Sequence, residues 1–282
     1  MDIAINGKPA DITLETETTL GEILGGIAQW MRGSGHLLSG LRLDGELIGS
    51  ASMGDVFSRE LAGIRSIDIL TSTRGELMAE ALIAAGDFLK AYGEAPFTGQ
   101  GRIREEWEKT PASGFLAGED PDLAGGLAQT FRGNGLPLPQ WEALIGERLR
   151  ELADPLEEAV TMEQAVSGIA RRLEDLPLDI QTGKDARAAE TVSLFSALTE
   201  KIFRLICLFR ERGLLSEPPA SEGPSADEPA EAFTLALREL LAAYEAKDAV
   251  LVGDLAEYEL APRLLRLYAV LNSTRKILKE EE

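Results

Sequence analysis

The stretch GLRLDGELIG, residues 40–49, carries the strongest local signal in this sequence. Two short apolar runs meet across the dipeptide Asp44–Gly45. Asp-Gly supplies the two positive-φ positions of a type I′ turn, whose twist matches that of paired antiparallel strands. The pattern therefore predicts a β-hairpin with strands at 41–43 and 46–48.

Three further strands are indicated by apolar residues that alternate with polar ones. They are the start of MDIAING, with Ile3 and Ile5, and the stretches DITLETE (11–17) and RSIDILT (65–71), and the dipeptide Asn6–Gly7 turns the chain between the first two. With the hairpin, these segments predict an N-terminal sheet.

A single helix is expected between the first two strands and the hairpin. Residues 20–31 repeat apolar side chains at helical spacing, and Thr19 and Glu22 form a capping-box pattern at the start. Gly25 and Gly26 each cost about 1 kcal/mol in a helix interior relative to alanine. Close approach of the helix backbone to a sheet would explain their presence.

The order strand–strand–helix–strand–short strand–strand within residues 1–73 resembles the ubiquitin-like β-grasp family, with LRLDGELIG as the third strand and the edge strand after it. The resemblance rests on pattern and covers about a quarter of the chain. Ubiquitin and the sulfur carriers act through a free C-terminal Gly-Gly, but here the last strand runs into TSTRGELMAEAL, which excludes conjugation and sulfur carriage. Arg42 is expected to face outward where ubiquitin presents its apolar recognition patch. The resemblance then implies a fused recognition or docking domain.

The remainder of the chain, 74–282, has helical periods and predicts a larger all-α helical bundle, so the fold class is α+β. A Gly/Pro-rich excursion at 93–138 is too long for a structureless loop and should contain short helices at about 102–109 and 121–131. A Pro/Ser-rich acidic stretch at 216–230 is predicted to be a flexible loop.

The helical region also allows more local expectations. Asp154 followed by Pro155 predicts the start of a helix that runs to about Leu173. A later helix should contain Phe233, Leu237, Leu240 and Tyr244 at helical spacing, and Pro262 should force a kink or a new helix start.

Charge and composition restrict the classes of partner and the cellular location that are expected. The chain carries a formal net charge of −20, which repels nucleic acid and anionic lipid, so neither is expected as a partner. It has no apolar run long enough to cross a membrane and no signal-peptide pattern. Its one cysteine cannot form an internal disulfide, which fits a reducing, cytoplasmic location.

The same residues argue against most kinds of catalysis and cofactor binding. The one histidine, His36, is expected in a surface Gly/Ser loop, and Cys207 is expected as a small core residue of a helix. Cysteine–histidine zinc sites, nucleophile–histidine pairs and di-iron motifs therefore lack their ligands. No phosphate-binding loop or EF-hand spacing occurs. We expect no catalytic residue, metal or cofactor.

Two groups of residues remain as candidates for a site. The first is acidic: Asp254, Glu257, Tyr258 and Glu259 precede Pro262, and paired carboxylates can perform acid–base chemistry or hold a divalent cation. A solvated acidic helix face is the simpler interpretation.

The second group consists of aromatic residues in the Gly/Pro-rich excursion: Phe97, Trp107, Phe115 and Phe131. Aromatic side chains dominate binding hot spots, so these residues could anchor a partner. More often such residues attach a long excursion to the body of their own protein.

Three functions are compatible with these observations. The first is a non-catalytic cytoplasmic protein–protein interaction module: an adaptor, scaffold or assembly factor. The second is a ligand- or metal-binding protein or enzyme that uses carboxylates of the helical domain. The third is an acidic chaperone for a secreted or motility component. The sequence leaves the protein partner and the oligomeric state open.

Overall fold

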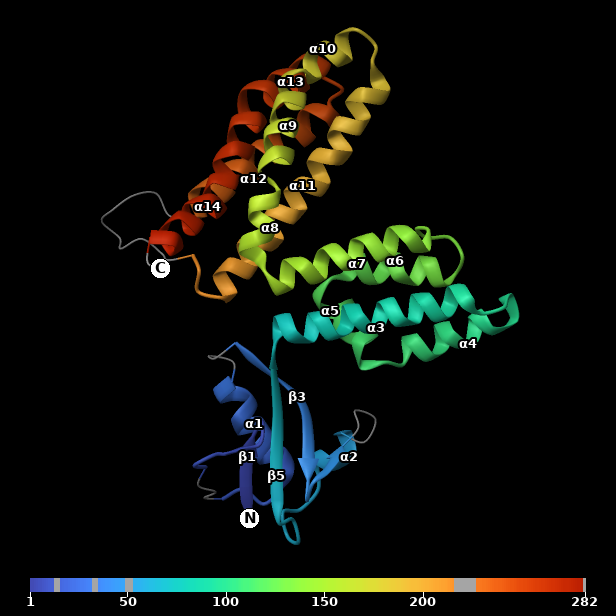
Figure 1. The fold of residues 1–282 in the computed structure, drawn as a ribbon, viewed down its shortest axis with the longest axis vertical. Coiled ribbons are helices and arrows are strands. Elements are labelled where there is room, and N and C mark those ends of the chain that lie inside the picture. The colour runs from blue at the N-terminus through green and yellow to red at the C-terminus, as the bar shows by residue number, and fades with distance from the viewer. Residues whose placement is uncertain (13–15, 32–34, 49–52, 216–226, 281–282) are drawn as a thin grey trace. The chain divides into compact units, whose positions relative to one another are not determined.

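The structure, a computed structural model, describes residues 1–12, 16–31, 35–48, 53–215 and 227–280. A mixed β-sheet with a helix occupies the N-terminal residues 1–73, and a mostly helical region follows, so the fold is α+β (Figure 1). The chain forms two compact units, residues 1–152 and residues 153–282.

The sheet has five strands in the order β2-β1-β5-β3-β4. β1 and β5 pair in parallel, whereas the other neighbouring pairs are antiparallel. This mixed order follows from the helix between β2 and β3, which lets the chain cross from one edge of the sheet to the other. The strands are β1 (Asp2–Ile5), β2 (Lys8–Pro9), β3 (His36–Leu43), β4 (Glu46–Ile48) and β5 (Ser66–Thr73).

The predicted hairpin is confirmed. Asp44 and Gly45 both have positive φ, 51° and 88°, and connect β3 to β4. The Asp44 carboxylate also accepts hydrogen bonds from the backbone N–H groups of Arg65 and Ser66, both at 2.9 Å. Asp44 therefore forms the hairpin turn and joins it to the start of β5.

These bonds make the sheet sensitive to acid at one residue. The backbone N–H of Ser66, then that of Arg65, lowers the pKa of Asp44, and a lowered folded pKa stabilises the fold above the unfolded value of about 4. That stability is lost as pH falls through the lower, folded pKa. We expect Asp44→Asn, which still tolerates positive φ, to be less stable than the unsubstituted chain at neutral pH. The difference in unfolding free energy between the two chains should disappear below about pH 4. Urea unfolding of both chains from neutral pH to below about pH 4 measures this difference. A difference that does not change with pH would contradict the stabilising role of the Asp44 carboxylate.

The core of the sheet domain lies between the sheet and α1 (Leu20–Met31). Leu20, Ile23 and Leu24 of the helix are buried together with Leu41 and Ile69 of the strands. The capping box at the start of α1 is confirmed, because its threonine and glutamate exchange both hydrogen bonds. A short helix, α2 (Met53–Phe57), precedes β5.

Two expectations for this domain need correction. The described residues of the predicted strand 11–17 do not form a strand. β2 ends at Pro9, and Ile12 packs against the core outside any strand. Residues 13–15 lie outside the described residues. Gly25 and Gly26 do not approach the sheet, since a Cβ added to either would have no neighbour within 4 Å. The close approach is at Gly21, where a Cβ would lie 2.6 Å from the carbonyl oxygen of Phe57.

The three glycines of α1 should therefore respond oppositely to alanine. We expect Gly25→Ala and Gly26→Ala each to stabilise the domain by about 0.5–1 kcal/mol, because alanine lowers the entropy of the unfolded chain and meets no obstacle. Gly21→Ala should destabilise it by about 1–3 kcal/mol, since backbone must move. Hydrogen exchange of the α1 amides in the whole chain measures all three. Destabilisation by Gly25→Ala would show that the exposed glycines have a structural role.

A second hydrophobic cluster lies among the helices that follow the sheet. α3 begins at the residue after β5, and Thr73 and Glu76, which have the same sequence pattern as Thr19 and Glu22, form a capping box there. Trp141 donates a hydrogen bond from Nε1 to Thr130 Oγ1 at 2.7 Å inside this cluster. The helices are α3 (Arg74–Glu94), α4 (Phe97–Glu108), α5 (Pro111–Glu119), α6 (Pro121–Phe131) and α7 (Leu138–Ala153).

The Gly/Pro-rich excursion is mostly helical, as α4, α5 and α6 occupy it. α6 has the expected bounds, α4 begins at Phe97 and so five residues before the expected start, and α5 was not expected. Thr110 and Asp120 cap α5 and α6 with their side chains, and a proline follows each cap at the first helical position. These Thr-Pro and Asp-Pro pairs are the sequence signal for both starts.

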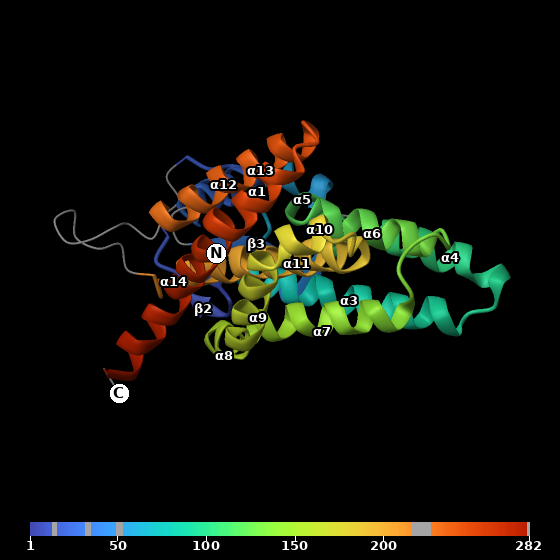
Figure 2. The same cartoon turned by 90° about the horizontal axis from the view of Figure 1, so that it is seen from above.

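Unit 153–282 is helical throughout its described residues and has a hydrophobic core of its own. α9, α11 and α14 lie side by side, as Figures 1 and 2 both show. The elements are α8 (Pro155–Thr161), α9 (Glu163–Glu174), α10 (Leu176–Gln181), α11 (Asp185–Glu211), α12 (Asp227–Glu245), α13 (Ala249–Asp254), the π-helix η2 (Leu255–Leu260) and α14 (Ala261–Glu280).

The local expectations for this unit are met in part. Asp154 caps a helix as predicted, but that helix breaks at Met162 into α8 and α9. Of the predicted flexible loop 216–230, residues 216–226 lie outside the described residues, and α12 already begins at Asp227. No helix in the described part of the chain is both long enough and apolar enough to cross a membrane.

Pro262 is accommodated by the π-helix η2. Proline has no N–H and its ring clashes with the carbonyl four residues earlier in a regular α-helix. In η2 the N–H of Ala261 bonds instead to the carbonyl of Ala256, five residues back. The chain thus passes from α13 through one wider turn into α14, which starts one residue before the proline.

Candidate functional site

The acidic candidate residues lie on the outer side of η2 and the end of α13. Asp254 and Tyr258 are exposed, whereas Glu257 and Glu259 are half-buried. Glu259 forms an ion pair with Arg263 at 2.6 Å. The four residues are therefore near one another in the chain, and all four are at least partly exposed.

The electrostatic field at these residues is negative. A hydrogen bond to Glu257, followed by the charges of Glu257 and Asp254, raises the pKa of the Tyr258 phenol. Within the residues that the structure describes, no three carboxylate, imidazole or thiol side chains are placed to hold a metal ion.

A divalent cation should therefore have no specific effect here. We expect magnesium, manganese, calcium and zinc each to leave the melting temperature of the chain unchanged. Replacing Asp254, Glu257 and Glu259 by Asn and Gln should change stability by only a few tenths of a kcal/mol, because relief of like-charge repulsion offsets the lost surface pair with Arg263. Thermal unfolding with each cation measures this. A saturable increase that the triple substitution abolishes would instead show a metal site.

The aromatic candidates do not form one group. Trp107 and Phe131 are buried in the α3–α7 cluster, and Phe115 packs against it. Their rings contribute to the domain's own core, since the Trp107 and Phe131 centroids are 6.0 Å apart. Phe97, at the first position of α4, is 89% exposed. The structure therefore leaves only Phe97 available to a partner as it stands.

Trp107 and Phe131 also line a groove of about 390 Å³ between α4, α5 and α6. Its remaining walls include small side chains, such as Ala117, Ala124 and Ala128. The groove is apolar, and Arg104 at its edge pairs with Glu108 in the next turn, at 3.9 Å.

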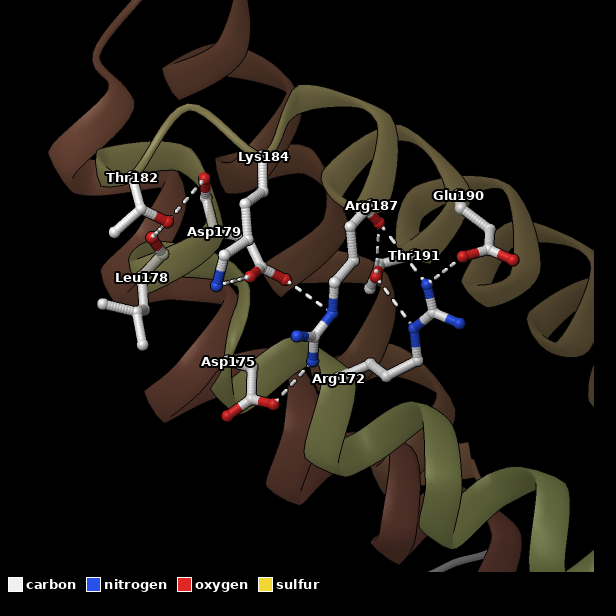
Figure 3. A network of polar contacts seen from close by, with 9 residues as sticks. All are labelled: Arg172, Asp175, Leu178, Asp179, Thr182, Lys184, Arg187, Glu190 and Thr191. Carbon is white, nitrogen blue, oxygen red and sulfur yellow. Dashed lines mark hydrogen bonds and ion pairs between the residues drawn. The ribbon is translucent and has the colours of Figure 1, made fainter.

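A polar network that sequence reasoning missed joins α9, α10 and α11 (Figure 3). Its centre is Asp179 of α10, whose side chain is 2% exposed. Arg187 Nε lies 3.1 Å from one carboxylate oxygen, as an ion pair outside hydrogen-bond geometry, and Lys184 Nζ lies 3.5 Å from the other. Arg187 also pairs with Asp175 at 2.9 Å.

Arg172 extends this network along α11. It donates to Glu190 at 2.6 Å and to Thr191 at 3.0 Å, and Thr191 donates to the carbonyl of Arg187 at 2.9 Å. These contacts connect three helices across two short turns. The arrangement fits a structural junction better than a reactive site, because the buried carboxylate already has two cations.

The structure corrects the expectations for the cysteine and the histidine. Cys207 is exposed on α11 and not a core residue, because the buried side of the helix there is formed by Ile206 and Phe209. Cys207 lines a groove between α11 and α12 of about 320 Å³. His36 lies not in a loop but at the start of β3, opposite Thr73 of β5.

The end of α12 and the start of α13 expose large apolar side chains. Leu241 and Tyr244 are 59% and 73% exposed, and Val250 and Leu251 are 69% and 44% exposed. Only the short turn 246–248 separates the two helices, so these residues surround one corner of the fold. We call this surface, Leu241, Tyr244, Val250 and Leu251, the corner patch.

Tyr244 differs in exposure from the other large apolar residues that the sequence places at helical spacing in α12. Phe233 is buried and Leu237 and Leu240 pack against the core, but the last turn buries Ala243 in place of Tyr244. A tyrosine at helical spacing does not reveal by itself that a small neighbour takes the inward position. The sequence signal for the exposure of Tyr244 was the charged segment Glu245, Lys247 and Asp248 that follows it, because such a segment is typical of a helix end.

Two family models match parts of the chain. One is described as the TP0873 N-terminal domain and matches residues 1–73. The other is a domain of unknown function, DUF8042, and matches residues 157–270, which include the polar network and the corner patch. No curated protein and no solved structure matches the chain.

Proposed function

We propose that this chain is a non-catalytic cytoplasmic interaction protein, an adaptor, scaffold or assembly factor, that binds a protein partner through the corner patch. The observation that carries the proposal is the exposure of four large apolar side chains around one turn, Leu241, Tyr244, Val250 and Leu251. Single exposed apolar residues are normal, but groups of them on a soluble protein mark interaction surfaces.

The N-terminal domain supports the same kind of function. Its strand order β2-β1-β5-β3-β4, with α1 packed on the sheet, agrees with a ubiquitin-like β-grasp used as a fused docking domain. Arg42 is exposed and pairs with Asp68 at 3.8 Å across the outer face of the sheet. That face is therefore polar at its centre. Because the corner patch is apolar, we assign partner binding to the helical unit and not to this face.

The test is capture of partners by the tagged whole chain from its own host, followed by quantitative mass spectrometry. Leu241→Ser with Tyr244→Ser changes the corner patch. Val192→Ser with Leu194→Ser is the matched control, because these residues are also exposed apolar side chains on a helix of the same unit. The proposal expects a partner that the first variant loses and the control keeps. Equal capture by both variants would contradict it.

A further inference from the structure

The chemistry of the partner can be inferred from the charges beside the corner patch, if the patch is the binding surface proposed above. Residues 238–259 contain two cations, Arg238 and Lys247. The acids in the same stretch are Glu239, Glu245, Asp248, Asp254, Glu257 and Glu259, six in all, and Glu259 is the one with an ion pair already described. The raised pKa of Tyr258 is consistent with this negative field.

The backbone around the patch is not available for strand pairing. The patch residues lie in helices, and the turn between them closes with N–H bonds from Lys247 to Tyr244 and from Asp248 to Ala243. Asp248 then caps α13 by accepting from the N–H of Leu251 at 3.0 Å. A partner must therefore bind through side chains, as a helix does when its apolar face packs on a groove or patch.

The acidic side chains also discriminate between the possible partners of the patch. A second copy of the chain would bring the same acids toward each other, and like charges facing across an interface are unfavourable. An anionic bilayer is repelled for the same reason. A cationic partner is attracted by this excess of acids and would still cover the apolar side chains.

We infer that the corner patch binds a basic amphipathic helix of a partner protein, whose apolar face covers Leu241, Tyr244, Val250 and Leu251 and whose lysines or arginines face the surrounding acids.

The test uses three short synthetic peptides with the whole chain. One is an amphipathic helix of leucine and lysine, the second has the same composition in scrambled order, and the third carries glutamate in place of lysine. Fluorescence anisotropy of the labelled peptides gives their affinities at low and high salt. We expect the first peptide to bind at least about tenfold more tightly than either of the others, a difference that mass action makes easy to resolve. Its affinity should fall as salt rises.

Matched variants locate the binding site. Leu241→Ser with Tyr244→Ser should weaken binding of the lysine peptide at least about tenfold, in the range of an interface hot spot. The control, Val192→Ser with Leu194→Ser, should leave it unchanged. Glu239→Gln with Glu245→Gln should weaken binding and reduce its salt dependence. Glu163→Gln with Glu174→Gln, which makes the same change of charge on α9, should have little effect.

The opposite results would overturn the inference. Equal binding of the scrambled peptide would mean attraction to net charge alone, and equal loss in the control variants would place the site elsewhere. A dimer in sedimentation that only the Leu241/Tyr244 variant abolishes would assign the patch to a second copy. If no peptide binds but host partners are still lost with that variant, the proposed function stands and the basic helix is wrong. If the Leu241/Tyr244 variant also captures the same host partners as the unsubstituted chain, the proposed function and the basic helix are both wrong.

Discussion

Truncation of Phe209 to alanine is expected to destabilise the helical unit 153–282 by about 3–5 kcal/mol, the range for large aromatic side chains deleted from a core. Phe209 is fully buried near the end of α11, among the side chains of the unit's hydrophobic cluster. Alanine would leave a cavity that long helices cannot close without shifting as rigid bodies. Urea unfolding of the whole chain, followed by far-ultraviolet circular dichroism, measures the loss.

The matched control lies two residues earlier in the same helix. Cys207 is exposed, so Cys207→Ala should change stability by less than about 0.5 kcal/mol. The pair therefore tests the helical phase of α11 directly. A large loss for Cys207→Ala and a small one for Phe209→Ala would mean that the buried face of this helix has been assigned to the wrong side.

Replacement of Arg187 by methionine should destabilise the same unit by about 2–3 kcal/mol. Asp179 is almost completely buried and depends on Arg187 and Lys184 for compensation of its charge. Removal of one partner leaves a buried carboxylate that is only partly compensated, which costs more than the ion pair itself contributes. Urea unfolding again measures the change.

The second substitution in this experiment removes the charge that was left behind. With Asp179→Asn in the same chain, most of the stability lost in Arg187→Met should return, because the buried group is then neutral. Lys184→Met, at the longer 3.5 Å contact, should cost less than Arg187→Met. If the double variant is no more stable than the single one, the guanidinium acts through Asp175 or through packing and not through Asp179.

Local signals in the sequence predicted local structure well. The Asp44–Gly45 turn, both capping boxes and the Asp154 cap depend on residues within a few positions of one another, so their chemistry is visible in the sequence. The class of the fold followed from the same patterns, because the alternating period changes to a helical one near residue 73.

Features that depend on packing were not predictable in this way. The exposure of Gly25, Tyr244 and Cys207 is set by which neighbouring residue takes the inward position, and several choices fit one helical period. The network around Asp179 requires three helices to meet, and nothing in the spacing of its residues shows that meeting. The corner patch was missed for the same reason.

The π-helix has a consequence for insertions and deletions in related chains. The buried pairs Leu255–Ala256 and Leu260–Ala261 are five residues apart, one more than a regular α-helix needs to keep them on one face. Loss of one residue between them would leave the buried seam continuous but would set the ring of Pro262 against a carbonyl of a regular helix. The length of this acidic segment is therefore fixed by the proline and not by the core, so a one-residue deletion there should be tolerated only together with replacement of Pro262.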